Sequence, residues 1–182
     1  MIGSLCLSIS FNYSICDCFK GFLEAMTHIQ KRTSKCIKFR KKESTDKGYV
    51  DITSFEASKK RKGGCRSKVG YTGKPQELNL AKSRCFKHRI IVHELMHALG
   101  FLHEQNRYDR DGYVNIAWGN IKKDKYGRDK SGNFKKRPKN VEDTLGTPYD
   151  FCSIMHYASD TMGKVDMHPN LKGTFIFFHH DP

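Results

Sequence analysis

The sequence predicts an α+β domain, in which a mixed, twisted sheet and two long helices form the N-terminal half and the C-terminal half is irregular. The first 80 residues contain several short segments of strand-like alternation, and two segments in the first 100 residues have helical apolar spacing. After residue 103 the composition becomes polar, lysine-rich and glycine-spaced. A length of 182 residues suits one domain. We divide it into halves 1–103 and 104–182, with a cleft between them.

Strands are predicted where apolar residues alternate or cluster between polar turns. From Leu5 to Ile15 every second residue is apolar, with serine and asparagine among the residues between, which is typical of a half-buried strand. Further predicted strands follow at 36–40, 49–55, 66–71 and 76–80.

Two helices are predicted from apolar spacing. Asp17 is placed to cap a helix whose apolar residues recur from Phe19 to Ile29 at intervals of three and four. A second helix is predicted over 86–99.

The second helix carries two histidines four residues apart, His93 and His97. This spacing places both imidazoles on one helix face, where they can bind one metal ion. Glu94 lies between them and can act as the base for a metal-bound water. Two such histidines also occur on ordinary amphipathic helices, so the pair alone does not decide between these interpretations.

A third histidine, His103, favours the metal site. It follows His97 by six residues, and an unbroken helix would carry it off the metal-facing side. The helix must therefore end before His103, and Gly100 allows this because glycine adopts left-handed conformations without steric cost. Three neutral imidazoles leave one open position on a tetrahedral zinc ion, which is the catalytic arrangement.

Two further motifs extend the pattern, FLHEQNRYDR at residues 101–110 and SIMHY at residues 153–157. With these motifs the chain resembles the astacin family of zinc endopeptidases, within the metzincins, from about Phe19 to about Tyr157. The resemblance implies a metzincin catalytic domain that hydrolyses peptide bonds in protein or peptide substrates.

The resemblance also implies roles for individual residues. It implies one zinc ion per chain bound by His93, His97 and His103, with Glu94 as general base and Tyr157 as the tyrosine that binds zinc or swings away from it. It implies Met155 in a Met-turn beneath the metal, and Glu104 as the residue that meets the free amino terminus in mature relatives. It further implies a Cys65–Cys85 disulfide. His156 is expected to be a buried, hydrogen-bonded histidine.

The cysteines and the first residues of the chain bear on the cellular compartment of the protein. Seven cysteines in a small domain favour an oxidising compartment. Cys36 lacks the C-terminal partner that the family supplies, which leaves Cys152, Cys6, Cys16 and Cys18 as alternatives. The first residues lack the basic start and continuous apolar run of a secretory signal. Secretion is therefore expected from the resemblance and the cysteines, and we expect a chain that lacks its leader or is a fragment.

Charge and hydropathy exclude several classes. No apolar run reaches about 18 residues, so no membrane span is expected. The net charge is +14, but the basic residues are scattered without aromatic interleaving or a base-reading motif, so no nucleic-acid binding is expected. A basic rim on the cleft would instead favour substrates that are acidic near the cleavage site. The competing hypothesis is a truncated, non-catalytic astacin-like protein that binds zinc or a partner.

Overall fold

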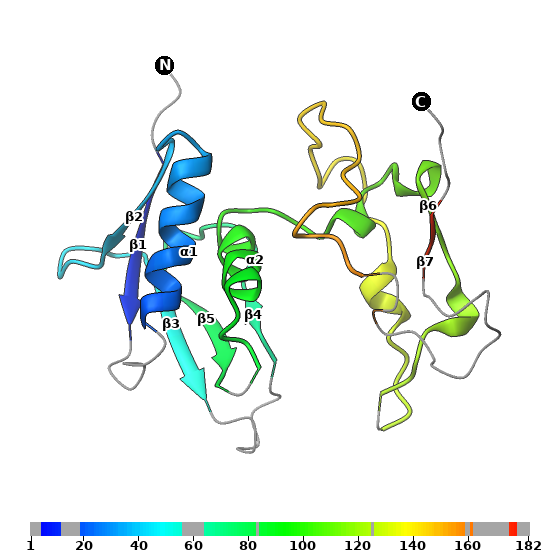
Figure 1. The fold of residues 1–182 in the computed structure, drawn as a ribbon, viewed down its shortest axis with the longest axis horizontal. Coiled ribbons are helices and arrows are strands. Elements are labelled where there is room, and N and C mark those ends of the chain that lie inside the picture. Colours follow the sequence, from blue (N-terminus) through cyan, green and yellow to red (C-terminus); the bar gives the residue numbers. More distant parts are fainter. Residues whose placement is uncertain are drawn as a thin grey trace. The chain divides into compact units, whose positions relative to one another are not determined.

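The computed structural model describes residues 5–11, 19–55, 64–82, 84–124, 126–158, 161 and 175–177. The chain forms two compact units, Met1–Phe101 and Leu102–Pro182. Figure 1 shows the sheet and both α-helices in the first unit, and short helices and strands in the second.

A five-stranded mixed sheet forms the centre of the first unit, with the order β2-β1-β3-β5-β4. Its strands are β1 (Leu5–Phe11), β2 (Ile37–Lys41), β3 (Val50–Phe55), β4 (Arg66–Ser67) and β5 (Gln76–Ala81). Strand β1 pairs in parallel with both β2 and β3, and β3 pairs in parallel with β5. Only the short β4 is antiparallel among the described strands of this sheet, pairing Ser67 with Leu78. The prediction of a mixed sheet is confirmed.

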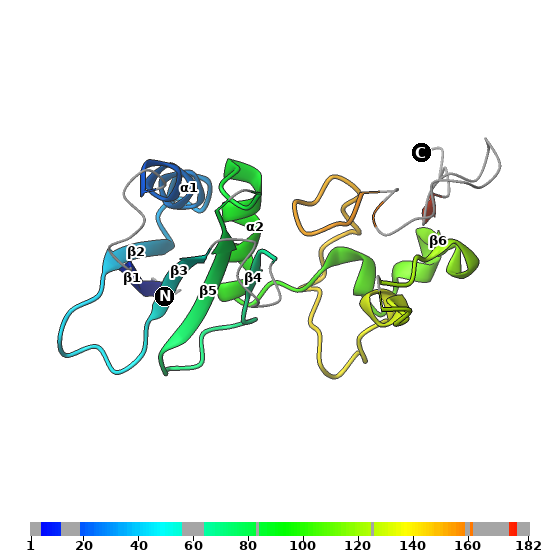
Figure 2. The same ribbon diagram turned by 90° about the horizontal axis from the view of Figure 1, so that it is seen from below.

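Helices α1 (Phe19–Arg32) and α2 (His88–Ala98) lie side by side on one face of this sheet (Figure 2). Their apolar residues meet those of the strands, which is why helical spacing and strand alternation both appear in the sequence. The fully or almost fully buried side chains include Leu7, Ile9, Phe22, Ile29, Ile52, Leu78, Leu80, Ile91 and Leu95. The core of this unit therefore lies between the sheet and the two helices, and α2 is anchored in it.

The described part of the first predicted strand, Leu5–Phe11, forms β1, while the rest of that prediction and the proposed cap Asp17 lie outside the described residues. The strand predicted over 66–71 is reduced to Arg66–Ser67. Gly70, within the predicted range, has a φ of 77°, a left-handed conformation that does not belong to a strand.

The second unit contains short elements around a small core of its own. It has strands β6 (Val114–Ile116) and β7 (Phe175–Phe177), which pair antiparallel, and 3₁₀ helices at Glu104–Asn106, Arg110–Gly112, Trp118–Asn120 and Ser131–Phe134. Its buried cluster consists of Val114, Ile116, Ile121, Phe134 and Tyr149. The irregular structure predicted for this region is therefore present, but the pairing of β6 with β7 was not predicted.

A disulfide bond joins Cys65 and Cys85, with Cα atoms 5.6 Å apart. It connects the segment before β4 to the segment before α2, and Cys85 is completely buried. Cys6 and Cys152 carry exposed thiols and are not disulfide-bonded, so the alternatives that paired either with Cys36 are wrong. Cys16 and Cys18 lie outside the described residues.

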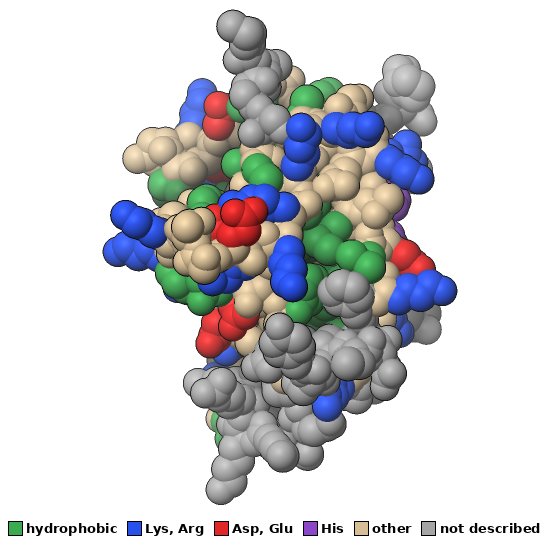
Figure 3. All heavy atoms as spheres, turned by 90° about the vertical axis from the view of Figure 1, so that its left-hand side faces the viewer, with side chains coloured by type: hydrophobic (Ala, Val, Ile, Leu, Met, Phe, Trp, Pro, Cys, Tyr) green, Lys and Arg blue, Asp and Glu red, His purple; other side chains and the backbone are tan. Residues whose placement is uncertain are grey.

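Basic side chains are spread over the surface. On the face in Figure 3, Lys and Arg side chains are interspersed with hydrophobic and neutral groups and a few acidic ones. Neither α-helix in the described part of the chain has the length and apolar character that a bilayer crossing requires.

Candidate metal centre

Helix α2 positions the first two candidate ligands. His93 and His97 project from consecutive turns, and their ring centroids are 4.7 Å apart. Ile91 and Leu95 on the same helix are buried against the core, which fixes the rotation of α2 about its axis. The histidine pair therefore faces away from that core in a defined direction.

The end of α2 turns the chain toward the third histidine. The N–H of Phe101 donates to the carbonyl oxygen of Met96 (3.0 Å), and the N–H of Gly100 donates to that of His97 (2.9 Å). These two bonds form a Schellman motif, which requires a left-handed residue just after the helix. Gly100 is that residue, with a φ of 110°.

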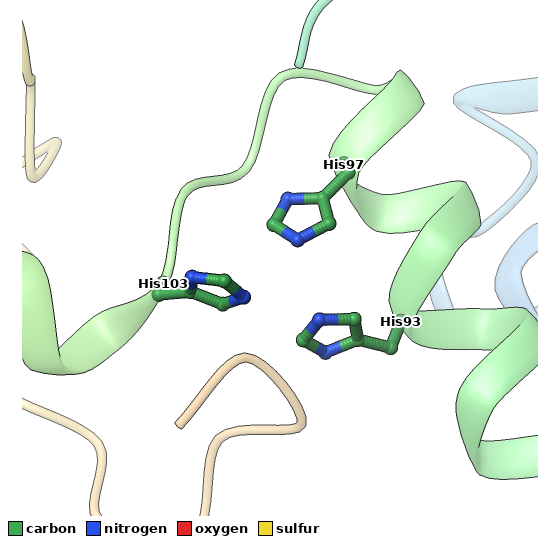
Figure 4. Close-up of side chains that lie close together, drawn as sticks. All are labelled: His93, His97 and His103. Carbon is green, nitrogen blue, oxygen red and sulfur yellow. The ribbon is translucent and has the colours of Figure 1, made fainter. Parts of the chain in front are cut away.

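The three histidines converge on one point. Figure 4 shows the rings of His93 and His97 on the helix and the ring of His103 on the segment that follows, all pointing toward one another. One nitrogen from each ring lies within 4.8 Å of the other two. His93 and His103 are half-buried and His97 is buried. In the described part of the chain this is the only group of three or more such side chains arranged to hold a metal ion.

A backbone contact fixes which nitrogen of His97 is available. Its Nδ1 lies 2.8 Å from the carbonyl oxygen of Phe101, which can only accept, so Nδ1 carries the proton. Nε2 is then the unprotonated nitrogen, as a metal ligand requires. Burial also lowers the pKa of His97, and this favours the neutral ring.

Glu94 is buried on the same helix, with 4% of its surface exposed. Burial raises its pKa to about 7, and a hydrogen bond from the backbone N–H of Ser67 opposes this shift. Its Oε2 is buried without a hydrogen-bond partner. An unpartnered buried carboxylate oxygen is costly, so its presence indicates a site organised to receive a proton or a ligand.

These residues fit a zinc ion. Three imidazole nitrogens are a ligand set that zinc binds readily, and a three-histidine set is found in catalytic zinc sites, where a fourth position stays open. The backbone bond to His97 is the kind of outer contact that orients metal-bound histidines. The buried Oε2 of Glu94, on the same helix as two of the histidines, is an acceptor that a water at such a site could use.

Tyr157 contacts the third histidine. Its ring centroid lies 4.7 Å from that of His103 and 5.7 Å, edge-on, from that of Phe134. Its backbone N–H donates to Oε1 of Gln105 (3.1 Å), and Gln105 is fully buried. Gln105 lies in the FLHEQNRYDR segment, but the sequence analysis assigned it no role. The sequence signal was its position two residues after a predicted ligand, while its burial is seen only in the structure.

Met155 and Glu104 are joined by a backbone bond, from the N–H of Glu104 to the carbonyl oxygen of Met155 (3.2 Å). Met155 is buried at 2% exposure. The Oε1 of Glu104 accepts from Nη1 of Arg107 and from the N–H of Asp150, each at 3.0 Å. The role that the resemblance implies for Glu104, contact with a free amino terminus, stays a prediction.

His156 is buried and its ring is held on both sides. Nδ1 donates to the carbonyl oxygen of Tyr157 (2.6 Å), and Nε2 accepts from the hydroxyl of Tyr149 (2.7 Å). Burial raises the pKa of Tyr149 well above its usual range, so the hydroxyl keeps its proton for this bond. Both ring nitrogens of His156 are therefore committed to these bonds, as expected for a histidine that is not a ligand.

Comparison with known proteins identifies the family. The family model of the astacin peptidases matches residues 11–174. The chain is 50% identical over 101 residues to the low choriolytic enzyme of Oryzias latipes, covering 56% of this chain and 34% of that protein. It is 37% identical over 177 residues to the zinc metalloproteinase nas-15 of Caenorhabditis elegans, covering 96% of this chain and 28% of that protein. The chain therefore spans about a third of the length of these curated relatives.

Solved structures agree with this assignment. High choriolytic enzyme 1 of Oryzias latipes, a hatching enzyme zinc-protease, superposes with a TM-score of 0.76 at 31% identity, covering 94% of this chain and 76% of that one. Myroilysin has the same fold at 19% identity, with a TM-score of 0.61. The match covers 89% of this chain and 82% of myroilysin. The histidine cluster, the fold and these matches lead to one conclusion: the chain belongs to the astacin family of peptidases.

Proposed function

We propose that this chain is the catalytic domain of a secreted zinc endopeptidase that hydrolyses peptide bonds in proteins. One observation carries the proposal. Three imidazoles converge, two of them from helix α2, and the same helix holds Glu94, whose buried Oε2 has no hydrogen-bond partner. A purely structural zinc site would use four protein ligands and would not need that carboxylate. The domain extends over 1–182, with 1–103 and 104–182 as its two halves.

His93, His97 and His103 would hold the metal. When bound, zinc supplies Lewis acidity that polarises a carbonyl and lowers the pKa of water to about 7. The left-handed turn at Gly100 sets the position of His103 relative to the other two ligands.

Glu94 would move the proton. A general base works best when its pKa lies near the working pH, and burial raises the pKa of Glu94 to about 7. The Ser67 N–H bond holds one side of the carboxylate and leaves Oε2 to take a proton from the attacking water. The same oxygen would then return that proton to the leaving amine.

Tyr157 would donate a hydrogen bond to the developing oxyanion. Its placement is supported by the contact of its ring with that of His103 and by the bond from its N–H to Gln105. Met155 would contribute packing beneath the metal, and Glu104 would hold the Met155 segment through its backbone bond.

Secretion is supported by the Cys65–Cys85 disulfide, since such bonds persist in oxidising compartments. The relatives named choriolytic enzymes and zinc metalloproteinases support a protein substrate for this chain as well.

The test combines zinc analysis with a quenched-peptide cleavage assay, with and without a chelator. We expect one zinc per chain and cleavage that stops on chelation and returns with zinc. His97→Ala should lose the zinc. Glu94→Gln should keep it and lose about 10²- to 10⁴-fold in activity. Tyr157→Phe should lose about 10²- to 10³-fold.

Glu43→Gln is the matched control for Glu94, because Glu43 is an exposed acid of the same unit. It should behave as the unmodified protein. Full zinc content in His97→Ala would contradict the ligand assignment. A chain that binds one zinc but cleaves no peptide would instead support the non-catalytic, zinc-binding alternative.

A further inference from the structure

A second pair of histidines lies on the first unit, outside the candidate metal centre. His28 is in the last turns of α1 and His88 is the first residue of α2. Both are exposed, and their ring centroids are 5.3 Å apart. Nδ1 of His28 and Nε2 of His88 are separated by 3.3 Å.

That separation matches two ligands of one metal ion. Nitrogens at about 2.0–2.1 Å from a tetrahedral zinc ion lie about 3.3–3.4 Å apart, by the geometry of the tetrahedron. A hydrogen bond from a ring N–H usually places its donor and acceptor closer, at about 2.7–3.2 Å. The observed distance is that of a long hydrogen bond between the two rings, and it also matches the separation of two nitrogen ligands on one zinc ion.

The surroundings form a pocket of about 530 Å³ with both histidines in its lining. Glu24 also lines it and precedes His28 by one helical turn, so the two side chains share a face of α1. As a lining residue, its carboxylate would add negative charge to a pocket that held a cation. Lys20, Lys31 and Arg32 line the pocket as well and oppose a cation, which limits the affinity.

We propose that His28 and His88 form a second site for a divalent transition-metal ion, with water completing the coordination. The ion would link α1 to the first turn of α2, the helix that carries His93, Glu94 and His97. Binding to the folded state alone would stabilise that helix pair. Imidazole ligands favour copper, nickel and zinc over magnesium and calcium.

The test is zinc titration of the full chain already loaded with one equivalent of zinc, followed by calorimetry and by thermal unfolding. We expect a second, weaker equivalent that raises the unfolding midpoint. His28→Asn and His88→Asn should each lower the affinity for this second zinc at least tenfold, because only one of the two imidazole ligands remains. Each variant should keep the first zinc, which shows that it is folded. Magnesium should have no effect.

The control is His179→Asn with His180→Asn, since two adjacent histidines offer metal ligands of their own. Loss of the second equivalent in this control alone would overturn the proposal, as would its retention in both His28→Asn and His88→Asn. An inert salt provides another check: screening the nearby basic groups should preserve or strengthen zinc binding. If sulfate or phosphate stabilised the protein through Lys31 and Arg32 while no second zinc bound, the pocket would be an anion site and the proposal wrong.

Discussion

The Nδ1 of His97 donates a hydrogen bond to the carbonyl oxygen of Phe101 across 2.8 Å, joining a candidate ligand to the turn that ends its own helix. The same turn is closed by the bond from Phe101 N–H to Met96. One local structure therefore ends the helix, sets the tautomer of His97 and directs the chain toward His103.

This coupling predicts that Gly100→Ala will lower both stability and zinc affinity. A Cβ at Gly100 would have no neighbour nearer than the Cα of Gly70 at 4.0 Å, so space is not the difficulty. The cost comes from the backbone, because a φ of 110° is strained for alanine by about 1–2 kcal/mol. Chemical unfolding and zinc titration would measure the two effects. Gly132→Ala, where a Cβ would meet open space, is the control and should change neither quantity much.

The Cys65–Cys85 disulfide predicts that reduction will lower the stability of the protein. Cys65 and Cys85 are 20 residues apart, and closing a loop of that size stabilises a protein by about 3 kcal/mol. The double substitution Cys65→Ser and Cys85→Ser should lower the free energy of unfolding by about 3 kcal/mol. Cys152→Ser removes an exposed thiol and should have little effect. Peptide mapping without reduction that recovered Cys65 and Cys85 as thiols, from protein made in an oxidising compartment, would contradict both the bond and the proposed secretion.

The Arg107–Asp109 ion pair predicts that the stability of the protein decreases at acidic pH. Nε and Nη2 of Arg107 donate to the two carboxylate oxygens of Asp109 at 2.9 and 2.8 Å, and these bonds lower the pKa of Asp109. A lowered folded-state pKa stabilises the protein above the unfolded value of about 3.9. That contribution is lost as the pH falls through the lower folded value.

Unfolding midpoints measured from pH 7 down to pH 2 would test this prediction. Asp109→Asn should be less stable than the unmodified protein at pH 7, and the difference should shrink below about pH 4. Asp143→Asn removes the same charge at an exposed position and serves as the control. A constant difference between Asp109→Asn and the unmodified protein at all pH values would show that the pair is not the cause.

The net charge predicts a substrate preference. The chain has 33 basic and 19 acidic side chains, and a positive potential in a cleft would attract peptides with Asp or Glu near the scissile bond. Cleavage profiling of a diverse peptide library should show this enrichment, and added salt should weaken it. No enrichment within three positions of the cut, or one that ignores ionic strength, would assign the charge to the solvated surface.

Much of the candidate site could be predicted from the sequence because its parts are local. The three histidines and Glu94 lie within residues 93–103, where helical periodicity and one glycine determine which side chains share a face. The helices and most strands were likewise predictable, since apolar spacing records which face of each element is buried. Strand ends were less predictable, as at β4, because pairing depends on a neighbouring strand that the local pattern does not specify.

The tertiary structure alone decided the contacts between distant segments. The pairing of β6 with β7, the bond from Asp150 to Glu104 and the bond from Tyr157 to Gln105 each join segments more than 40 residues apart. His28 and His88, 60 residues apart, meet only because α1 and α2 pack on the same sheet. A local pattern specifies which face of an element is buried, but not which other element it will meet. Which elements meet depends on how all the buried faces pack together in one core. No single residue or local motif determines this packing.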